Sequence, residues 1–302
     1  MYEKFYGFKE KPFSLTPDTE YFYRYRGHQE ALNVLMVALR NGEGFVRVTG
    51  EVGTGKTLLC RQLLTLIQDD CATAYLPNPF LSPLELYQAI AHDLGLDVPL
   101  DASMHQLSQE IFLELVRLRE LERPLVILID EAQVMPRKSL EALRLLSNLE
   151  TEKEKLLHIF FFAQPEFEQR LQEKNLRQLL QRITFSYTLV PLDREELTAY
   201  IEHRLNVAGW RGQDLFTTDA IKVLYKASGG IPRLINLLAH KALMAAYGEG
   251  IQRIDRKIVL AAIADTSGLN PLRKKWWPPY FIEFGMVMIV AVVTLFVFGE
   301  WQ

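Results

Sequence analysis

The sequence predicts an α/β fold with a parallel sheet core, a small all-helical lid domain and a C-terminal transmembrane helix. Three patterns in its 302 residues support this prediction. Short runs rich in β-branched and aromatic residues alternate with helical stretches over residues 44–190, which is typical of a parallel sheet with helical crossovers. Helical patterns alone follow that region, and a long apolar segment lies within residues 276–299.

Five strands are expected in the first region. The last three are continuous apolar or aromatic runs, as strands buried on both faces of a parallel sheet require. Helices fill the gaps and give right-handed crossovers. The expected strands are FVRVT (45–49), ATAYL (72–76), LVILID (125–130), LHIFFFA (157–163) and TFSYTLV (184–190), and the expected helices cover 57–68, 83–94, 106–121, 138–149 and 166–181.

The strand pattern stops after Pro191, and four helical segments follow at about 193–208, 217–228, 231–247 and 255–265. Asp193, Thr217 and Asp255 precede three of them and suit the N-cap position. The expected regions are therefore an aromatic-rich N-terminal segment (1–25), an α/β domain (26–191), a helical lid domain (192–266), a linker (267–279) and a transmembrane helix (280–299).

The N-terminal segment carries nine aromatic residues within its 25 positions. We expect it to pack over the α/β domain, because so many aromatic rings gain free energy from burial. A groove for a peptide or another partner is the alternative.

The apolar segment at 276–299 contains one charge, Glu283, and is long enough to cross a bilayer. Arg273, Lys274 and Lys275 precede it, and basic residues favour the cytoplasmic side. The expected location is thus the inner membrane, with a single pass and the N-terminal domains in the cytoplasm. A buried core helix or an amphipathic surface helix is the alternative interpretation.

Composition gives no support to several other classes of protein. With 34 basic and 37 acidic residues the net charge is −3, so composition gives no support to nucleic-acid binding through a basic surface. The two cysteines, Cys60 and Cys71, form no disulfide framework, and neither has a neighbouring His or Cys at metal-ligand spacing.

One motif matches the pattern G-x-x-x-x-G-K-[ST] in full, between a β-rich run and an amphipathic helix. The glycines let main-chain N–H groups surround a phosphate, and the following helix N-terminus adds positive potential. Lys56 would reach the β- and γ-phosphates of ATP, and the Thr57 hydroxyl would bind Mg²⁺. The motif reads Gly50, Glu51, Val52, Gly53, Thr54, Gly55, Lys56 and Thr57.

The run LVILIDE ends a hydrophobic strand with two carboxylates. At that position Asp130 would hold the Mg²⁺ shell, and Glu131 would orient and deprotonate the attacking water. Alternatively, Glu131 caps the next helix.

Further polar residues are candidates for the same site. Gln164 follows the strand at 157–163 and would sense the γ-phosphate if that strand lies between the other two; it could equally be a turn residue. Arg182, with Arg177 second, would reach the nucleotide of a neighbouring subunit. Arg233 would report lid closure from a helix that starts at Pro232. His28 is a weaker candidate for a contact with the adenine base of the nucleotide. Solvated surface arginines are the competing interpretation.

Together the motifs GEVGTGKT, LVILIDE, QRI (181–183) and GGIPR make the chain resemble AAA+ ATPases. It resembles most closely the general secretion pathway protein A family and its MSHA pilus biogenesis branch. The segments that carry this closer resemblance, within residues 1–265, are FYGFKEKPFSLTPDTEYFY, RGHQEAL, ALRLLSNLET, FFAQPEFEQRL, LRQLLQRI and PLDREELTAYIEHRL. Ala163 departs from the glycine that the family often has before Gln-Pro.

The resemblance implies a membrane-anchored ATPase that uses Mg-ATP to drive assembly of a type II secretion or pilus machine. It also implies a homo-oligomer, expected to be a ring, and secretion or pilus assembly proteins as partners. Larger members continue into a peptidoglycan-binding region that is not in this sequence, so the short form favours the pilus branch. The alternatives are a nucleic-acid-loading ATPase and a nucleotide-gated scaffold without turnover.

Overall fold

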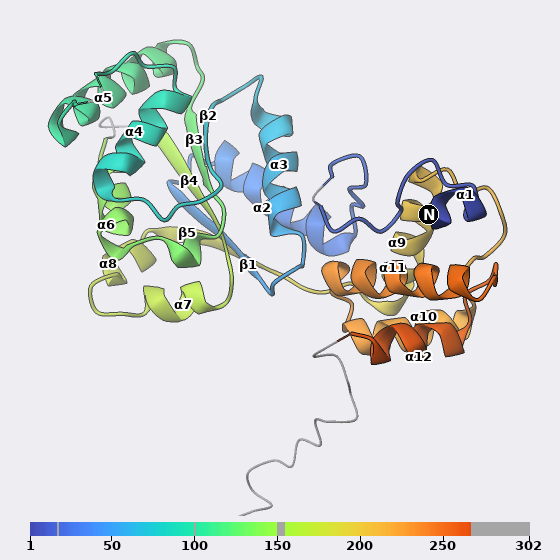
Figure 1. Cartoon of the computed structure of the whole chain (residues 1–302). Helices are drawn as coiled ribbons and strands as arrows, with labels where there is room; N and C mark the ends of the chain where they lie inside the picture. Colours follow the sequence, from blue (N-terminus) through green and yellow to red (C-terminus); the bar gives the residue numbers. More distant parts are fainter. Residues whose placement is uncertain (17, 100, 150–154, 267–302) are drawn as a thin grey trace, which may run out of the picture.

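The computed structural model describes residues 1–16, 18–99, 101–149 and 155–266. Its centre is a five-stranded parallel sheet in the order β2-β3-β4-β1-β5 (Figure 1). The expectation of a parallel sheet is confirmed, and the strand after which Gln164 stands does lie between β1 and β3. The strands are β1 (Phe45–Gly50), β2 (Ala72–Leu76), β3 (Leu125–Ile129), β4 (Leu157–Ala163) and β5 (Ile183–Leu189).

Helices cover both faces of the sheet, and alternate strand residues enter two separate cores. Phe160 and Phe162 pack with helices α2 and α3 on one face, whereas Phe161 packs with α4 to α8 on the other. This period of two is the normal consequence of a pleated strand. The helices are α2 (Arg26–Arg40), α3 (Lys56–Ile67), α4 (Pro83–Asp93), α5 (Met104–Glu120), α6 (Arg137–Leu146), α7 (Glu166–Leu171) and α8 (Arg177–Leu180), with a 3₁₀ turn η1 (Ala132–Val134).

The helix expected over 166–181 is divided into α7 and α8. Leu171, Leu176 and Leu179 are all buried in the same core. In an uninterrupted helix, at about 100° per residue, Leu176 would lie roughly 140° around the axis from Leu171. The break after α7 lets all three leucines reach the core.

The lid consists of α9 (Arg194–Val207), α10 (Thr218–Ser228), α11 (Pro232–Gly248) and α12 (Arg256–Ala264). The three expected N-caps are confirmed, because the side chains of Asp193, Thr217 and Asp255 each accept a main-chain hydrogen bond from the first turn. Pro232 occupies the first turn of α11, where its missing N–H costs nothing.

Most of the aromatic N-terminal segment packs on the lid, and only its end, at Phe22 and Tyr25, contacts the α/β domain, so the prediction was wrong for most of the segment. We call its described part, residues 1–16 and 18–25, the strap; it includes helix α1 (Tyr2–Tyr6). Tyr2, Tyr6 and Phe13 are buried in one cluster with lid residues from α9 to α12. Both faces of the sheet are already covered by helices, whereas four short lid helices cannot bury their apolar surface alone.

The predicted fold class also needs a correction at its C-terminal end. No helix in the described ranges is both long and apolar enough to span a bilayer. The helix expected over 280–299 lies outside the described residues, and the fold that the structure supports is the α/β core with its helical lid. The inner-membrane location stays a prediction from the sequence.

Candidate functional site

The predicted phosphate loop, the two carboxyl groups and Gln164 gather at the carboxyl edge of the sheet, whereas Arg177 and Arg182 precede the start of β5. Gly50 ends β1, Asp130 follows β3 and Gln164 follows β4, and these three strands are adjacent. In parallel sheets this edge is where ligands bind, because every strand ends there and the following helices begin there.

Two glycines of the loop between β1 and α3 adopt backbone angles that side chains disfavour. Gly53 has φ +86° and Gly55 has φ +95°. Space is short as well, since a Cβ at Gly53 would lie 2.6 Å from Arg233 Cβ, and a Cβ at Gly55 would lie 2.9 Å from the His28 ring. The loop is therefore confined between the lid and α2, and other residues would not fit at either position.

Lys56 is buried at the first turn of α3. Its Nζ donates to the carbonyl oxygens of Gly50 (2.8 Å) and Glu51 (3.1 Å). Burial lowers the pKa of the Lys56 ammonium, and the nearby carboxylates of Glu131 and Asp130 oppose that shift. The ammonium group thus stays inside the loop, where it would meet a phosphate.

Thr57 and Asp130 meet directly across the edge of the sheet. The Thr57 hydroxyl donates to Asp130 Oδ2 at 2.6 Å, and the Glu131 N–H donates to Asp130 Oδ1 at 2.9 Å. Burial raises the pKa of the Asp130 carboxyl, although these two hydrogen bonds act the other way. A hydroxyl beside a carboxylate is a donor set suited to Mg²⁺, so these residues fit the metal that the motif implies.

Glu131 is held by its own conformation and by two amides. It adopts a left-handed backbone conformation, φ 51°, which is uncommon for a residue other than glycine. Gln164 Nε2 donates to Glu131 Oε2 at 3.0 Å. Gln133, which the sequence interpretation missed, donates to the same oxygen and accepts from the Gln164 N–H at 3.0 Å. Gln164 therefore contacts the predicted base itself.

The lid contributes Arg233 at the start of α11. Its main-chain N–H donates to Gly53 O at 3.2 Å, so the lid and the phosphate loop are in direct contact. Gly230, with φ +77°, makes this approach possible, because a Cβ there would lie 2.0 Å from Leu192 O.

Arg182 and Arg177, the two candidates for acting on the nucleotide of a neighbouring subunit (the trans arginine), differ in their surroundings. Arg182 is partly buried and donates to Arg144 O (3.2 Å), Ser147 Oγ (2.6 Å) and Asn148 Oδ1 (2.6 Å) near the end of α6. Arg177 is exposed at the first turn of α8. The structure thus engages Arg182 within its own subunit and leaves Arg177 facing solvent.

His28 lies under the phosphate loop. Its Nε2 is 3.1 Å from Thr54 O, and its ring is stacked on Phe22. Burial lowers the pKa of His28 to about 4, so the ring is neutral at pH 7. His28 supports the main chain of the loop through this contact.

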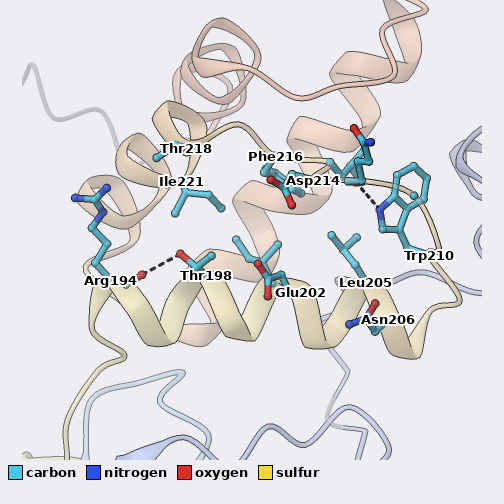
Figure 2. A pocket seen from close by; sticks show the side chains of 14 residues that line it. Arg194, Thr198, Glu202, Leu205, Asn206, Trp210, Asp214, Phe216, Thr218 and Ile221 are labelled. Atoms are coloured by element: carbon cyan, nitrogen blue, oxygen red, sulfur yellow. Dashed lines mark hydrogen bonds between the residues drawn. The ribbon is translucent and has the colours of Figure 1, made fainter.

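A cavity of about 350 Å³ lies between the phosphate loop, the lid and the strap. Besides Lys56, Thr57, Glu131 and Arg233, it is lined by strap residues and by Tyr200, Arg204 and Asn236 of the lid. This second set could not be predicted from the sequence, because no local motif marks residues that meet only in the folded chain. Another cavity, of about 380 Å³, lies along α9 near Trp210 and contains none of the predicted site residues (Figure 2).

The strand order, the phosphate loop, the paired carboxyl groups and the helical lid define the α/β P-loop AAA+ fold. The model of the AAA domain family matches residues 39–171. Among solved structures, the chain is similar to Cdc6p of Pyrobaculum aerophilum, with a TM-score of 0.62, 18% identity and coverage of 82% of this chain and 71% of that one. It is also similar to the ORC2 protein of Aeropyrum pernix (ADPNP-ADP complexes), with a TM-score of 0.60, 18% identity and coverage of 83% and 72%.

A particular relative is much more similar in sequence. The chain is 40% identical over 301 residues to general secretion pathway protein A of Aeromonas hydrophila. The match covers 100% of this chain and 54% of that protein, so the chain spans about half the length of this relative. The expected relation to the secretion family is supported, whereas a particular closeness to the pilus branch stays a prediction.

Proposed function

We propose that the chain is an Mg-ATP-hydrolysing AAA+ ATPase that assists assembly of a type II secretion or MSHA-type pilus machine. The site supports the ATPase part of this proposal, and the sequence similarity to general secretion pathway protein A supports the secretion part. The same proposal includes self-association into a ring. Arg177 is exposed, so its guanidinium would be able to reach the nucleotide bound by a neighbouring subunit.

One observation carries the proposal: the hydrolytic side chains that a single subunit supplies meet at one edge of the sheet. Lys56 lies inside the phosphate loop, Thr57 is bonded to Asp130, and Glu131 is held in place by Gln164. A scaffold that only retained nucleotide would need neither an oriented carboxylate nor an amide that fixes it.

The residues divide the work of hydrolysis. Bound Mg-ATP would supply the phosphoanhydride bond and a metal that neutralises phosphate charge. Lys56 and the loop N–H groups bind phosphate oxygens, while Thr57 and Asp130 hold the metal. Glu131 accepts a proton from the attacking water, and Gln164 keeps its carboxylate aimed. Arg233 connects the lid to the phosphates. Loss of the γ-phosphate on hydrolysis therefore alters the position of the lid.

The substitution Glu131→Gln tests the role of the base. It removes the proton acceptor but keeps the shape of the side chain, so we expect phosphate release to fall at least about 100-fold. ATP binding should stay within about twofold of the wild type, measured by calorimetry with Mg²⁺. Glu173→Gln is the matched control, because Glu173 is exposed after α7 and lies outside the cavity. Phosphate release by Glu131→Gln at the wild-type rate would reject Glu131 as the base.

A further inference from the structure

Arg204 of α9 is buried although its guanidinium carries a permanent charge. The residue is 4% exposed. The partners that hold it are neutral groups, a main-chain carbonyl, a phenol and two aromatic rings. The tyrosine rings favour a cation, and the carboxylates of Glu10 and Asp18 act on the same Tyr21 as Arg204, so these surroundings suit a charged side chain that joins the strap to the lid.

The guanidinium joins two separate points of the strap to the lid. Its Nε donates to Pro12 O at 2.6 Å, and its Cζ lies 4.5 Å from the centre of the Tyr21 ring. Its Nη1 also donates to the hydroxyl of Tyr200 at 3.2 Å. Arg204 therefore fastens the strap on both sides of its bend.

The bend held in this way is a wall of the nucleotide cavity. Ser14, Leu15, Thr16 and Asp18 line it from the strap, together with the phosphate loop and Arg233. A second connection supports the wall, because Asn236 Nδ2 donates to Ser14 O at 3.4 Å and Asn236 Oδ1 accepts from the Tyr200 hydroxyl at 2.8 Å.

Arg204 itself also lines the cavity. Its buried Nη2 has no hydrogen-bond partner within the part of the chain that the structure describes. Unsatisfied buried donors are rare in folded proteins and call for a functional explanation. Because this nitrogen is closed to solvent, Arg204 lines the cavity with its other atoms, and it acts on the site by holding the strap.

We propose that Arg204 is a positioning residue of the nucleotide site, which holds the strap as the wall against which the nucleoside part packs. This inference rests on the proposed function. The phosphate loop takes the phosphates, and the rest of the lining of the same cavity, from the lid and the strap, is left for the sugar and base. Arg233 acts on the phosphates, whereas Arg204 acts on the nucleoside through the strap.

The test compares hydrogen exchange of the full chain with and without Mg-ADP. In the wild type, ADP should slow exchange both at residues 50–57 and in the peptide that contains Ser14 to Thr16. In Arg204→Met the protection at 50–57 should remain and the strap protection should disappear. The affinities for ATP and ADP should fall by the same factor, about tenfold, whereas Arg233→Met should weaken ATP more than ADP.

Lys241→Met is the control for loss of a lid cation, because Lys241 pairs with Asp265 away from the cavity. It should leave both regions protected. Tyr200→Phe removes the hydroxyl between Arg204 and Asn236 and serves if Arg204→Met does not fold. We expect it to weaken ADP binding about threefold and to reduce strap protection.

The outcomes separate the two proposals. ADP protection at 50–57 without protection of the strap in the wild type would overturn the role of Arg204 and leave the ATPase proposal intact. The role of Arg204 is likewise overturned if the folded variants keep strap protection and bind ADP within twofold of the wild type. Absence of protection at 50–57 in the wild type would overturn the proposed function and this inference with it.

Discussion

At the scale of single residues, the site depends on buried polar groups whose protonation is set by their neighbours. Asp130 keeps two hydrogen bonds that favour its carboxylate although burial opposes ionisation. His28 is the opposite case, a ring whose burial favours the neutral form under the phosphate loop. Both groups tie stability to pH, and the effect of His28 falls between pH 4 and pH 6.5, because burial lowers its pKa to about 4.

His28 should make the protein less stable as the pH falls below about 6.5. The unfolded histidine takes up a proton near pH 6.5, whereas the folded one does so only near pH 4. Between these values the unfolded state binds more protons, so stability is complete above pH 6.5 and declines toward pH 4, by up to about 3 kcal/mol. Urea unfolding of the wild type and His28→Gln at pH 7.0, 5.5 and 4.5 measures this difference.

His28→Gln keeps a donor for Thr54 O but has no group that titrates in this range. Its free energy of unfolding should therefore depend less on pH than that of the wild type. Parallel curves for the two proteins would show that His28 is not buried in the neutral form. His105→Gln, at an exposed position of α5, is the control.

At the scale of elements, the sequence predicts well those helices, strands and caps that depend on neighbouring residues in the chain. β3 and β4 are apolar runs buried at every position, and the caps at Asp193, Thr217 and Asp255 have the residues that helix starts prefer. The expectation that the last strand is buried on both faces was wrong, because β5 lies at the edge of the sheet and exposes alternate residues. The phosphate loop and the carboxylates after β3 are contiguous motifs and could be located in the same way. Local pattern was sufficient for these features.

The features that were missed have non-local causes. The break between α7 and α8 follows from three leucines that must reach one core, and the strap lies on the lid because the sheet is already covered. Gln133 and Arg204 reach the site only through folding, from the 3₁₀ turn η1 and from the middle of α9. Such contacts join residues far apart in the chain, so a local helical or polar pattern does not predict them.

The turn between α10 and α11 should be intolerant of a side chain at one glycine and tolerant at its neighbour. A Cβ at Gly230 would overlap Leu192 O, whereas a Cβ at Gly229 would meet no atom within 4 Å. Both glycines have positive φ, so Gly229→Ala reports the cost of backbone conformation alone, about 1 kcal/mol. Gly230→Ala should cost at least about 2 kcal/mol more and shift the lid away from the loop.

Thermal unfolding of both variants measures these costs, and ATP affinity reports the position of Arg233. Equal melting temperatures for the two variants would show that the contact between Gly230 and Leu192 O does not position the lid.

At the scale of the whole molecule, the nucleotide site is built by three parts of the chain. The sheet provides the phosphate loop and the carboxylates, the lid provides Arg233, and the strap closes the cavity. The strap is fixed to the lid, while Tyr25 at its end donates to Val190 O (3.2 Å) and Thr54 O (3.4 Å) beside the loop. Strap and lid therefore form one unit that contacts the loop at both Arg233 and Tyr25.

The proposed assembly predicts that ATP turnover per subunit rises with protein concentration. An arginine that acts on a neighbouring subunit needs a free guanidinium, and Arg177 is exposed whereas Arg182 is engaged near α6. Arg177→Ala should abolish the concentration-dependent rise and leave the melting temperature unchanged. Arg182→Ala should lower the free energy of unfolding by about 1–3 kcal/mol, because Ser147 and Asn148 lose a charged donor.

Phosphate release over a hundredfold range of concentration, together with thermal unfolding, measures both effects. Turnover per subunit that is constant over this range in the wild type would contradict the proposed contribution between subunits. Retention of the rise in Arg177→Ala and its loss in a stable Arg182→Ala would transfer that role to Arg182.

The most direct test of the account is ATP binding by calorimetry, with Mg²⁺, to the wild type and to Lys56→Ala. Lys56 is the cation buried inside the phosphate loop, and its loss leaves Gly50 O and Glu51 O without their donor. We expect the wild type to bind one ATP per chain and the folded Lys56→Ala variant to bind at least about 100-fold more weakly. Equal affinity in both proteins, or no binding by the folded wild type, would contradict a nucleotide site at residues 50–57.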